Sequence, residues 1–203
     1  MIRGTRFVIS SIALLLVLTG AGGAASESTF RAGPASNYAH QSADQVTVGA
    51  KAYDDEDLTA EAFGKKTDLL RYGVLPVLVV IENQRQKSLD LRTLEVNLVA
   101  ADGRHVSATN PEDLPYLGKH AKPPGIGPRT PIRFPAKKNP LNAPEIVERA
   151  FSAKMLPPGD SASGFFYFEA RSEAGDKIYL NGLRDARSGE DILYFEFPLN
   201  PRP

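Results

Sequence analysis

Few residues in this chain of 203 have a type and spacing that suit catalysis, and a serine near a predicted turn comes first among them. Ser161 follows a Gly-Asp pair in PPGDSASG (157–164), as the nucleophile of some esterases does. Such a serine needs a base to take its proton and a third group to orient that base. Position 163 is serine where G-x-S-x-G requires glycine. His40, His105 and His120 fall in a predicted linker, beside a predicted hairpin turn and in a proline-rich segment. We therefore interpret the segment as a turn before a strand and predict that the protein is not an enzyme.

Metal binding has little support in the sequence. The three histidines show neither H-E-x-x-H nor a pair four residues apart, and no cysteine is present to supply a thiolate. The acidic run from Asp54 to Asp57 offers the oxygen ligands that calcium prefers, but the glycine-centred spacing of an EF-hand loop is absent. The run is typical of a solvated helix start, with calcium binding as the alternative. We expect no metal site and no cofactor.

A basic, proline-rich segment is the strongest candidate for a binding surface. HAKPPGIGPRTPIRFPAKKNP (120–140) contains six prolines, five Lys or Arg residues and no acidic residue. It belongs to a predicted insertion over 108–142. Unstructured loops above about 12 to 15 residues are uncommon in compact domains and tend to be functional or disordered. Frequent proline removes amide donors and holds the backbone extended, which excludes a helix or a central strand here.

Two interpretations of this segment remain open. In one, its apolar side chains, including Ile126, pin it across a sheet face while its cations face water. In the other, the extended chain presents cations and apolar anchors to a partner or an anionic surface, with little loss of conformational entropy on binding. The candidate binding residues are Arg129, Ile132, Arg133, Phe134, Lys137 and Lys138.

The N-terminus has the composition of an export signal. Two arginines in MIRGTR precede the apolar run FVISSIALLLVL and the small residues of TGAGGAAS, which together predict a signal peptide over 1–25. A retained membrane anchor is the alternative, but a span needs about 20 predominantly apolar residues. Residues 26–44 are polar and aperiodic, which predicts a flexible linker before a domain over 45–203. Export without cysteines favours a periplasmic or secreted protein of a bacterial envelope.

The charge balance argues against nucleic acid as a partner. The whole chain carries 24 basic and 24 acidic residues, and loss of Arg3 and Arg6 with the signal leaves 22 basic residues against 24 acidic ones. A nucleic-acid-binding domain is usually strongly basic. We also expect no transmembrane segment after signal cleavage.

Hydrophobic patterning predicts a mainly β fold. The continuous apolar run 74–81 is typical of a strand buried on both faces, whereas 94–100 alternates and leads through Asp102 and Gly103 into a short partner strand at 104–108. Further strands are predicted near 46–53, 164–170, 177–183 and 192–199. Short helices are predicted at 57–66 and at 142–153, the second capped by Asn142 with Ile146, Val147 and Phe151 on one side. About seven strands with local hairpins favour an immunoglobulin-like antiparallel β-sandwich.

Two segments carry a resemblance to known domains. LPVLVVIENQRQKSLDLRTLEVNLVAADGRHV (75–106) and LPPGDSASGFFYFE (156–169) resemble the immunoglobulin-like domains, of the telokin-like and FxLYD type, found in bacterial envelope proteins of unknown function. Those domains have a hydrophobic strand ending in Asn, an alternating strand with an Asp-Gly turn, and a Pro-Gly turn before an aromatic strand. The resemblance covers less than a third of the chain and does not include the basic insertion. It implies the fold and no catalytic residues.

The sequence thus predicts a non-catalytic, exported module that binds an unknown envelope protein. The alternative is a module that binds an anionic envelope component, such as a lipid headgroup or an acidic polymer, through the basic segment.

Overall fold

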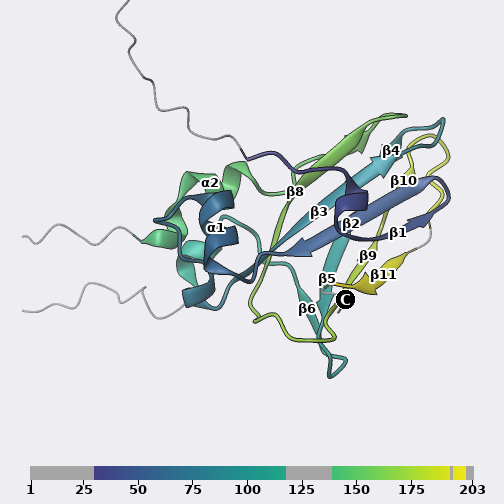
Figure 1. Cartoon of the computed structure of the whole chain (residues 1–203). Helices are drawn as coiled ribbons and strands as arrows, with labels where there is room; N and C mark the ends of the chain where they lie inside the picture. The colour runs from purple at the N-terminus through teal and green to yellow at the C-terminus, as the bar shows by residue number, and fades with distance from the viewer. Residues whose placement is uncertain (1–29, 118–138, 193, 200–203) are drawn as a thin grey trace, which may run out of the picture.

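The computed structural model describes residues 30–117, 139–192 and 194–199, and eleven antiparallel strands in this part form three sheets (Figure 1). The first sheet has the order β1-β2-β3-β8 and consists of β1 (Ala39–Ala43), β2 (Val46–Ala52), β3 (Leu75–Asn83) and β8 (Ser161–Phe168). The second has the order β11-β9-β5-β6 and consists of β11 (Phe195–Pro198), β9 (Lys177–Asn181), β5 (Glu95–Val99) and β6 (His105–Ser107). A small third sheet has the order β10-β4-β7 and consists of β10 (Arg184–Asp185), β4 (Leu89–Asp90) and β7 (Met155–Leu156).

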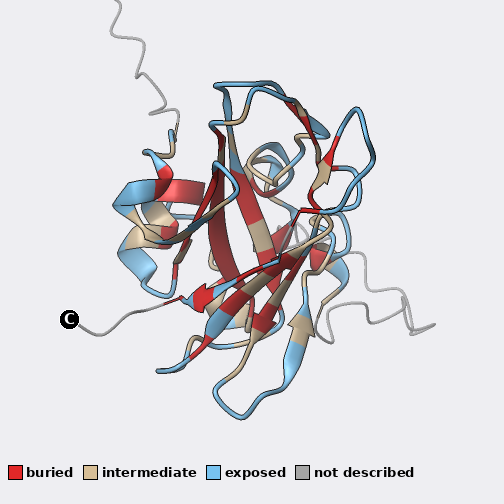
Figure 2. Cartoon of the chain, turned by 90° about the vertical axis from the view of Figure 1, so that its right-hand side faces the viewer, coloured by how far each residue is buried: buried red, intermediate tan, exposed pale blue. Residues whose placement is uncertain are grey.

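The main apolar core lies between the two four-stranded sheets. Alternate side chains of both sheets point into it, among them Val48, Val79, Leu98, Leu180 and Phe195, none of which is more than 1% exposed. Figure 2 shows the buried positions running along the central strands, with exposed positions concentrated in the turns. The predicted mainly β, antiparallel sandwich is confirmed.

The strand count exceeds the predicted seven because four strands lack a sequence signal. The seven expected strands correspond to β2, β3, β5, β6, β8, β9 and β11. The two-residue strands β4, β7 and β10 are too short to show any alternation. β1 has the sequence AHQSA, whose small and polar side chains are only partly buried or exposed.

The second half of the predicted linker 26–44 is ordered, because β1 (Ala39–Ala43) lies within it. The strand pairs along its whole length with β2. Asp44 and Gln45 join the two strands with φ of 48° and 60°, the left-handed values that a two-residue type I′ hairpin turn requires. Such turns usually contain Asn-Gly, so the pair Asp-Gln does not announce one. The predicted signal peptide lies outside the described residues.

β3 is buried on both faces, as its continuous apolar run predicts. Val77 and Ile81 belong to the core between the sheets, whereas Leu78 and Val80 belong to a second apolar cluster on the outer face of the first sheet. Pro76 is the second residue of the strand, near its beginning as expected. Its carbonyl accepts a hydrogen bond from the N–H of Tyr53, the residue after β2.

Short helices cover the outer face of the first sheet at one end (Figure 1). They are α1 (Glu56–Phe63), α2 (Pro144–Glu148) and the 3-10 turns η2 (Leu70–Tyr72), η3 (Leu114–Tyr116) and η4 (Pro140–Asn142). A further 3-10 turn, η1 (Ala35–Asn37), lies apart from them against β1 and β2. The predicted helix at 57–66 is confirmed as α1. Asp55 caps it by accepting hydrogen bonds from the N–H groups of Asp57 and Leu58 at 2.7 and 3.3 Å. Across the described segments, no helix is both long and apolar enough to cross a membrane.

The prediction for the second helix is only partly correct. α2 is shorter than expected and its cap position is Ala143, which makes no side-chain cap, while Asn142 ends η4. Ile146 is fully buried, but Val147 is 49% exposed and Phe151 lies beyond the helix end. An Asn-Ala-Pro start suits either residue as cap, and the preceding 3-10 turn takes up Asn142.

Asp185 is buried at the turn after β10, with a side chain only 3% exposed. Its carboxylate accepts hydrogen bonds from the N–H groups of Ser188 and Arg187, both at 3.0 Å. Lys87 Nζ lies 3.2 Å away and Arg85 Nη2 3.5 Å. The Ser188 bond above all, with the contributions of Lys87 and Arg187, holds the pKa of this carboxyl well below its usual range although burial opposes the shift. The carboxylate therefore fixes the turn in its charged form.

Candidate binding groove

The two sides of the sandwich differ in how they are closed. On one side β1 contacts β11, and the N–H of Glu196 donates to Gln41 Oε1 at 2.9 Å. On the other side β6 pairs only with positions 97–99 of β5. The first half of β5 has no neighbouring strand there among the described residues. A groove opens between this bare edge and β8.

The groove consists of two adjoining cavities of about 700 and 530 Å³. Leu94, Phe151, Ser152 and Phe166 line both cavities, so we treat them together and call them the inter-sheet groove. The rest of its lining is contributed mainly by Leu91, Arg92, Glu95, Val96, Asn97, Ser107, Ala108, Thr109, Asn110, Pro111, Val147, Ala150, Ala153, Lys154, Phe165 and Tyr167. Each cavity by itself is within the range of about 300 to 1,000 Å³ typical of ligand pockets.

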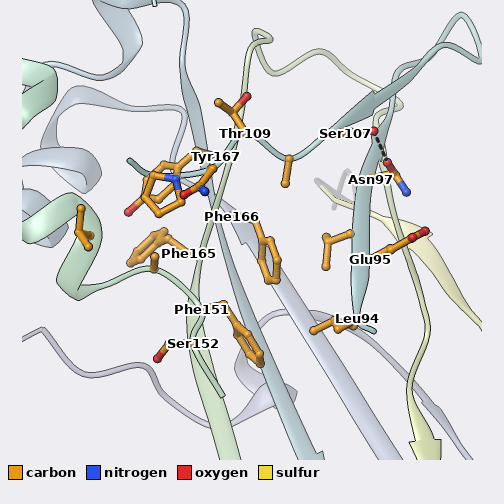
Figure 3. Close-up of a pocket in the computed structure, with 16 residues that line it drawn as sticks. Leu94, Glu95, Asn97, Ser107, Thr109, Phe151, Ser152, Phe165, Phe166 and Tyr167 are labelled. Atoms are coloured by element: carbon orange, nitrogen blue, oxygen red, sulfur yellow. Dashed lines mark hydrogen bonds between the residues drawn. The ribbon is translucent and has the colours of Figure 1, made fainter. Parts of the chain in front are cut away.

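Two stacked phenylalanines form the floor. The rings of Phe151 and Phe166 lie 5.3 Å apart between centroids at an interplanar angle of 24°. Figure 3 shows both side chains in the opening, with Leu94, the residue before β5, facing them. Phe151, Phe166 and Leu94 are each half-buried. The floor therefore leaves apolar area available to a ligand.

The wall that carries Phe151 is held close to β8 by backbone contacts. The N–H of Phe165 donates to the Arg149 carbonyl at 2.8 Å, and the N–H of Phe151 donates back to the Phe165 carbonyl at 3.0 Å. This approach requires glycine at position 164, since a Cβ there would lie 2.4 Å from the Phe151 Cα. At the other end, the N–H of Thr109 donates to the Tyr167 carbonyl at 2.7 Å and closes the groove.

The charged residues in the described lining are Glu95 in the first cavity, and Arg92 and Lys154 in the second. Arg92 is engaged by Asp90, with Nε 3.0 Å from Oδ1. This side-chain hydrogen bond, together with one from the Arg92 backbone, lowers the pKa of Asp90 to about 2. Ser107 donates to Asn97 Oδ1 at 3.0 Å on the rim (Figure 3). The arrangement suits binding of an apolar, uncharged group.

Comparisons with known proteins leave the family open. No protein-family model matches the chain, and no curated protein matches it significantly. Among solved structures it is similar to a "putative lipoprotein (ycdA)" from Bacillus subtilis, with 14% identity and a TM-score of 0.38 over 79% of this chain. This chain spans only 38% of that protein. It is also similar to the secreted protein MPT63 of Mycobacterium tuberculosis, with 17% identity and a TM-score of 0.36 over 81% of this chain and 95% of that one. With TM-scores below 0.5, the fold assignment rests on this chain's own strand pairing.

Ser161 lies outside the groove and is not in the turn itself. It is the first residue of β8, opposite Glu82 of β3, and is exposed. The turn is formed by the preceding residues, where the N–H of Gly159 donates to the Asn83 carbonyl at 2.7 Å. His40 is in β1, with Nδ1 2.8 Å from the carbonyl oxygen of Tyr38. The segment thus leads into a strand, as expected, but the strand starts three residues earlier than the predicted 164.

The other sequence-predicted sites have different outcomes. The acidic run serves α1, because Asp55 is its cap and the next two acids fill its first turn. Among the residues that the structure describes, no three His, Cys, Asp or Glu side chains gather in a way that could hold a metal ion. All six candidate binding residues of the basic segment, from Arg129 to Lys138, lie outside the described residues.

Sequence reasoning missed the groove because its parts are far apart in the chain. Phe166 and Leu94 have the signature of ordinary strand residues, and Phe151 falls in the pattern of the predicted second helix. Their half-buried state depends on the short length of β6, which leaves the edge of β5 open. The sequence predicts a strand at 104–108, whereas β6 spans only His105–Ser107, so the pattern did not indicate this opening.

Proposed function

We propose that this protein is an exported, non-catalytic β-sandwich that works as an interaction or accessory module of the bacterial cell envelope. Its contact surface is the inter-sheet groove, and its ligand is an apolar, extended segment of a partner protein. The stacked pair Phe151 and Phe166 carries this proposal. Aromatic side chains in a concave site that excludes water are the usual centres of binding energy in protein interfaces.

Two further observations support the proposal. The groove presents serine and threonine hydroxyls but no histidine among the residues that line it, so a serine there has no imidazole base beside it. The bare edge of β5 runs along the groove and offers backbone groups to an added strand, a common way of binding an extended peptide.

The groove is tested by blocking its rim without touching the core. Peptides are selected from a random library on the wild-type domain, and their dissociation constants are measured by fluorescence anisotropy. Val147→Lys places a charge on the groove rim at a position that is 49% exposed. Met155→Lys is the matched control, since Met155 is 56% exposed and lies outside the groove. We expect Val147→Lys to weaken binding by about tenfold or more, and Met155→Lys to leave it within about twofold. Equal effects of the two substitutions would refute the groove as the contact surface.

An anionic envelope ligand bound by the basic segment is the second candidate. The basic residues from Lys122 to Lys138, with no acidic residue between them, favour this candidate. Binding to vesicles that contain an anionic lipid, or to polyglutamate, should then disappear at high salt and after combined replacement of Arg129, Arg133, Lys137 and Lys138 by Gln. A contact anchored by apolar side chains should survive both changes.

Export is tested on the native N-terminus. The proposal expects mass spectrometry of the protein recovered from the cell envelope or the medium to find a mature chain that starts near Ser26. An intact Met1 in the membrane fraction would instead show a retained anchor.

A further inference from the structure

Arg149 has a buried nitrogen without a hydrogen-bond acceptor. It follows α2 directly, and its guanidinium carbon lies 5.9 Å from the centre of the Phe30 ring and 6.0 Å from that of Phe63. Its Nη1 atom is buried and meets no acceptor among the described residues. Arg149 also takes part in none of the ion pairs found between described residues.

Arg149 as a whole is half-buried, but a guanidinium with one buried, unpaired nitrogen is incompletely compensated. The two phenylalanine rings attract the cation through their faces, which contributes about 0.5 to 2 kcal/mol per contact in general. A ring face does not replace the acceptors that guanidinium N–H groups require, and a buried donor left unpaired is costly. A carboxylate matches the guanidinium best, because its two oxygens accept two parallel hydrogen bonds from the planar fork.

Arg149 is one of the residues that line a cavity of about 370 Å³. Arg31 brings a second guanidinium to its lining, and Ser163 on β8 brings a hydroxyl. Phe30 and the fully buried Leu78 supply apolar walls. The cavity therefore combines two cations and a neutral donor with an apolar surface, in a volume suited to a small organic ligand.

We propose that this cavity, the Arg149 site, binds a small organic carboxylate with a short apolar chain. The carboxylate pairs with Arg149 and Arg31, and the chain lies along Phe30 and Leu78. Glu148 also lines the cavity and repels a second negative charge, which favours a monocarboxylate over a phosphate dianion. The Arg149 site and the inter-sheet groove share no charged residue. The proposal for this site does not depend on the function proposed for the groove.

The test uses hexanoate as probe, with hexanamide and inorganic phosphate as comparisons. Titrations of the 15N-labelled domain are followed by NMR at the arginine Nε–H signals and at the backbone amides of Ser163 and Gly164. Arg149→Gln and Arg31→Gln remove one cation each. Arg187→Gln is the control, since Arg187 is exposed and lies outside the site.

Hexanoate should shift the Arg149 and Ser163 signals of the wild-type domain, and hexanamide should not. We expect Arg149→Gln to weaken hexanoate binding by about tenfold or more and Arg31→Gln by about threefold, with no change for Arg187→Gln. If Arg149→Gln fails to fold, the Arg31 variant and the discrimination between acid and amide decide the question. Unchanged spectra with hexanoate, equal binding of hexanamide or phosphate, or full binding by a folded Arg149→Gln variant would overturn the proposal.

Discussion

Replacement of Asn83 by aspartate should destabilise the sandwich strongly and in a pH-dependent way. Asn83 ends β3 and is 1% exposed. Its Nδ2 group donates to the carbonyl oxygens of Lys87, Leu156 and Pro157 at 2.8, 3.0 and 3.0 Å. Its Oδ1 accepts from the N–H of Arg85 at 3.1 Å. One amide thus ties the end of β3 to the turns on either side of it.

The magnitude follows from these contacts. Asn83→Ala removes the donors and the acceptor, so three carbonyls in a buried or partly buried site each lose a hydrogen bond, which should lower the free energy of unfolding by about 2 to 3 kcal/mol. Asn83→Asp keeps the acceptor but places a buried carboxylate against three carbonyl oxygens. We expect this variant to lose about 3 to 5 kcal/mol at pH 7.

The pH dependence has a definite sign. Burial and the carbonyl dipoles should raise the pKa of the introduced carboxyl above its unfolded value of about 3.9, because its protonated form can donate to a carbonyl. The folded state then binds the proton more tightly than the unfolded state does. The penalty is therefore full above the folded pKa and shrinks as the pH falls through it.

Urea unfolding followed by circular dichroism at pH 7 and pH 5 checks both points. Asn142→Asp is the control, because Asn142 is exposed at the end of η4. The role assigned to this amide would be contradicted if Asn83→Asp were as stable as Asn83→Ala at pH 7. It would also be contradicted if the loss of unfolding free energy of Asn83→Asp relative to wild type were no smaller at pH 5 than at pH 7.

Three further predictions concern single contacts. Gly182→Ala should cost about 2 to 4 kcal/mol in urea unfolding, since its φ is 79° and a Cβ would lie 1.8 Å from the Thr93 carbonyl oxygen; Gly189→Ala, at φ 71° in open space, should cost only about 1 kcal/mol. Equal losses of unfolding free energy in the two variants would show that the positive φ, and not the contact with Thr93, sets the cost. Because the pKa of Asp185 is lowered in the folded state, its stabilisation is present above the unfolded pKa of about 3.9 and is lost as the pH falls through the folded pKa. The melting temperature should therefore fall more steeply below pH 4 for the wild type than for Asp185→Asn. Parallel plots of melting temperature against pH would contradict this. Tyr167→Phe removes a hydroxyl that donates to a buried carbonyl of α2 at 2.6 Å and should cost about 1 to 2 kcal/mol, which an unchanged urea midpoint would exclude.

The sequence predicted those elements whose pattern reflects their own burial. β3 reads as a continuous apolar run because it packs on both faces, and β5 alternates because only Val96 and Leu98 face the core. α1 carries its own cap and stop signals in Asp55 and Gly64. Each of these features is local, so a single segment is sufficient to indicate it.

The features that sequence reasoning missed depend on contacts between distant segments. β1 is a strand because β2 pairs with it, and the groove exists because β6 is short. The Arg149 site joins the first described residues to β8 and to the end of α2. The binding role of the basic segment remains a prediction, since its six candidate residues lie outside the described part of the chain.

The position of β3 in the sheet has a consequence for how the chain folds. Val79 of β3 lies opposite Gly164 of β8, so the last ladder of the first sheet joins residues 85 positions apart. At synthesis rates of about 5 to 20 residues per second, the apolar strand waits about 4 to 17 s for its partner. Until then β2 can pair with one edge of Leu75 to Ile81, but the edge that will face β8 stays open and is prone to aggregation. Slow, late closure of the sheet should make this chain a client of holding chaperones before it reaches its native state.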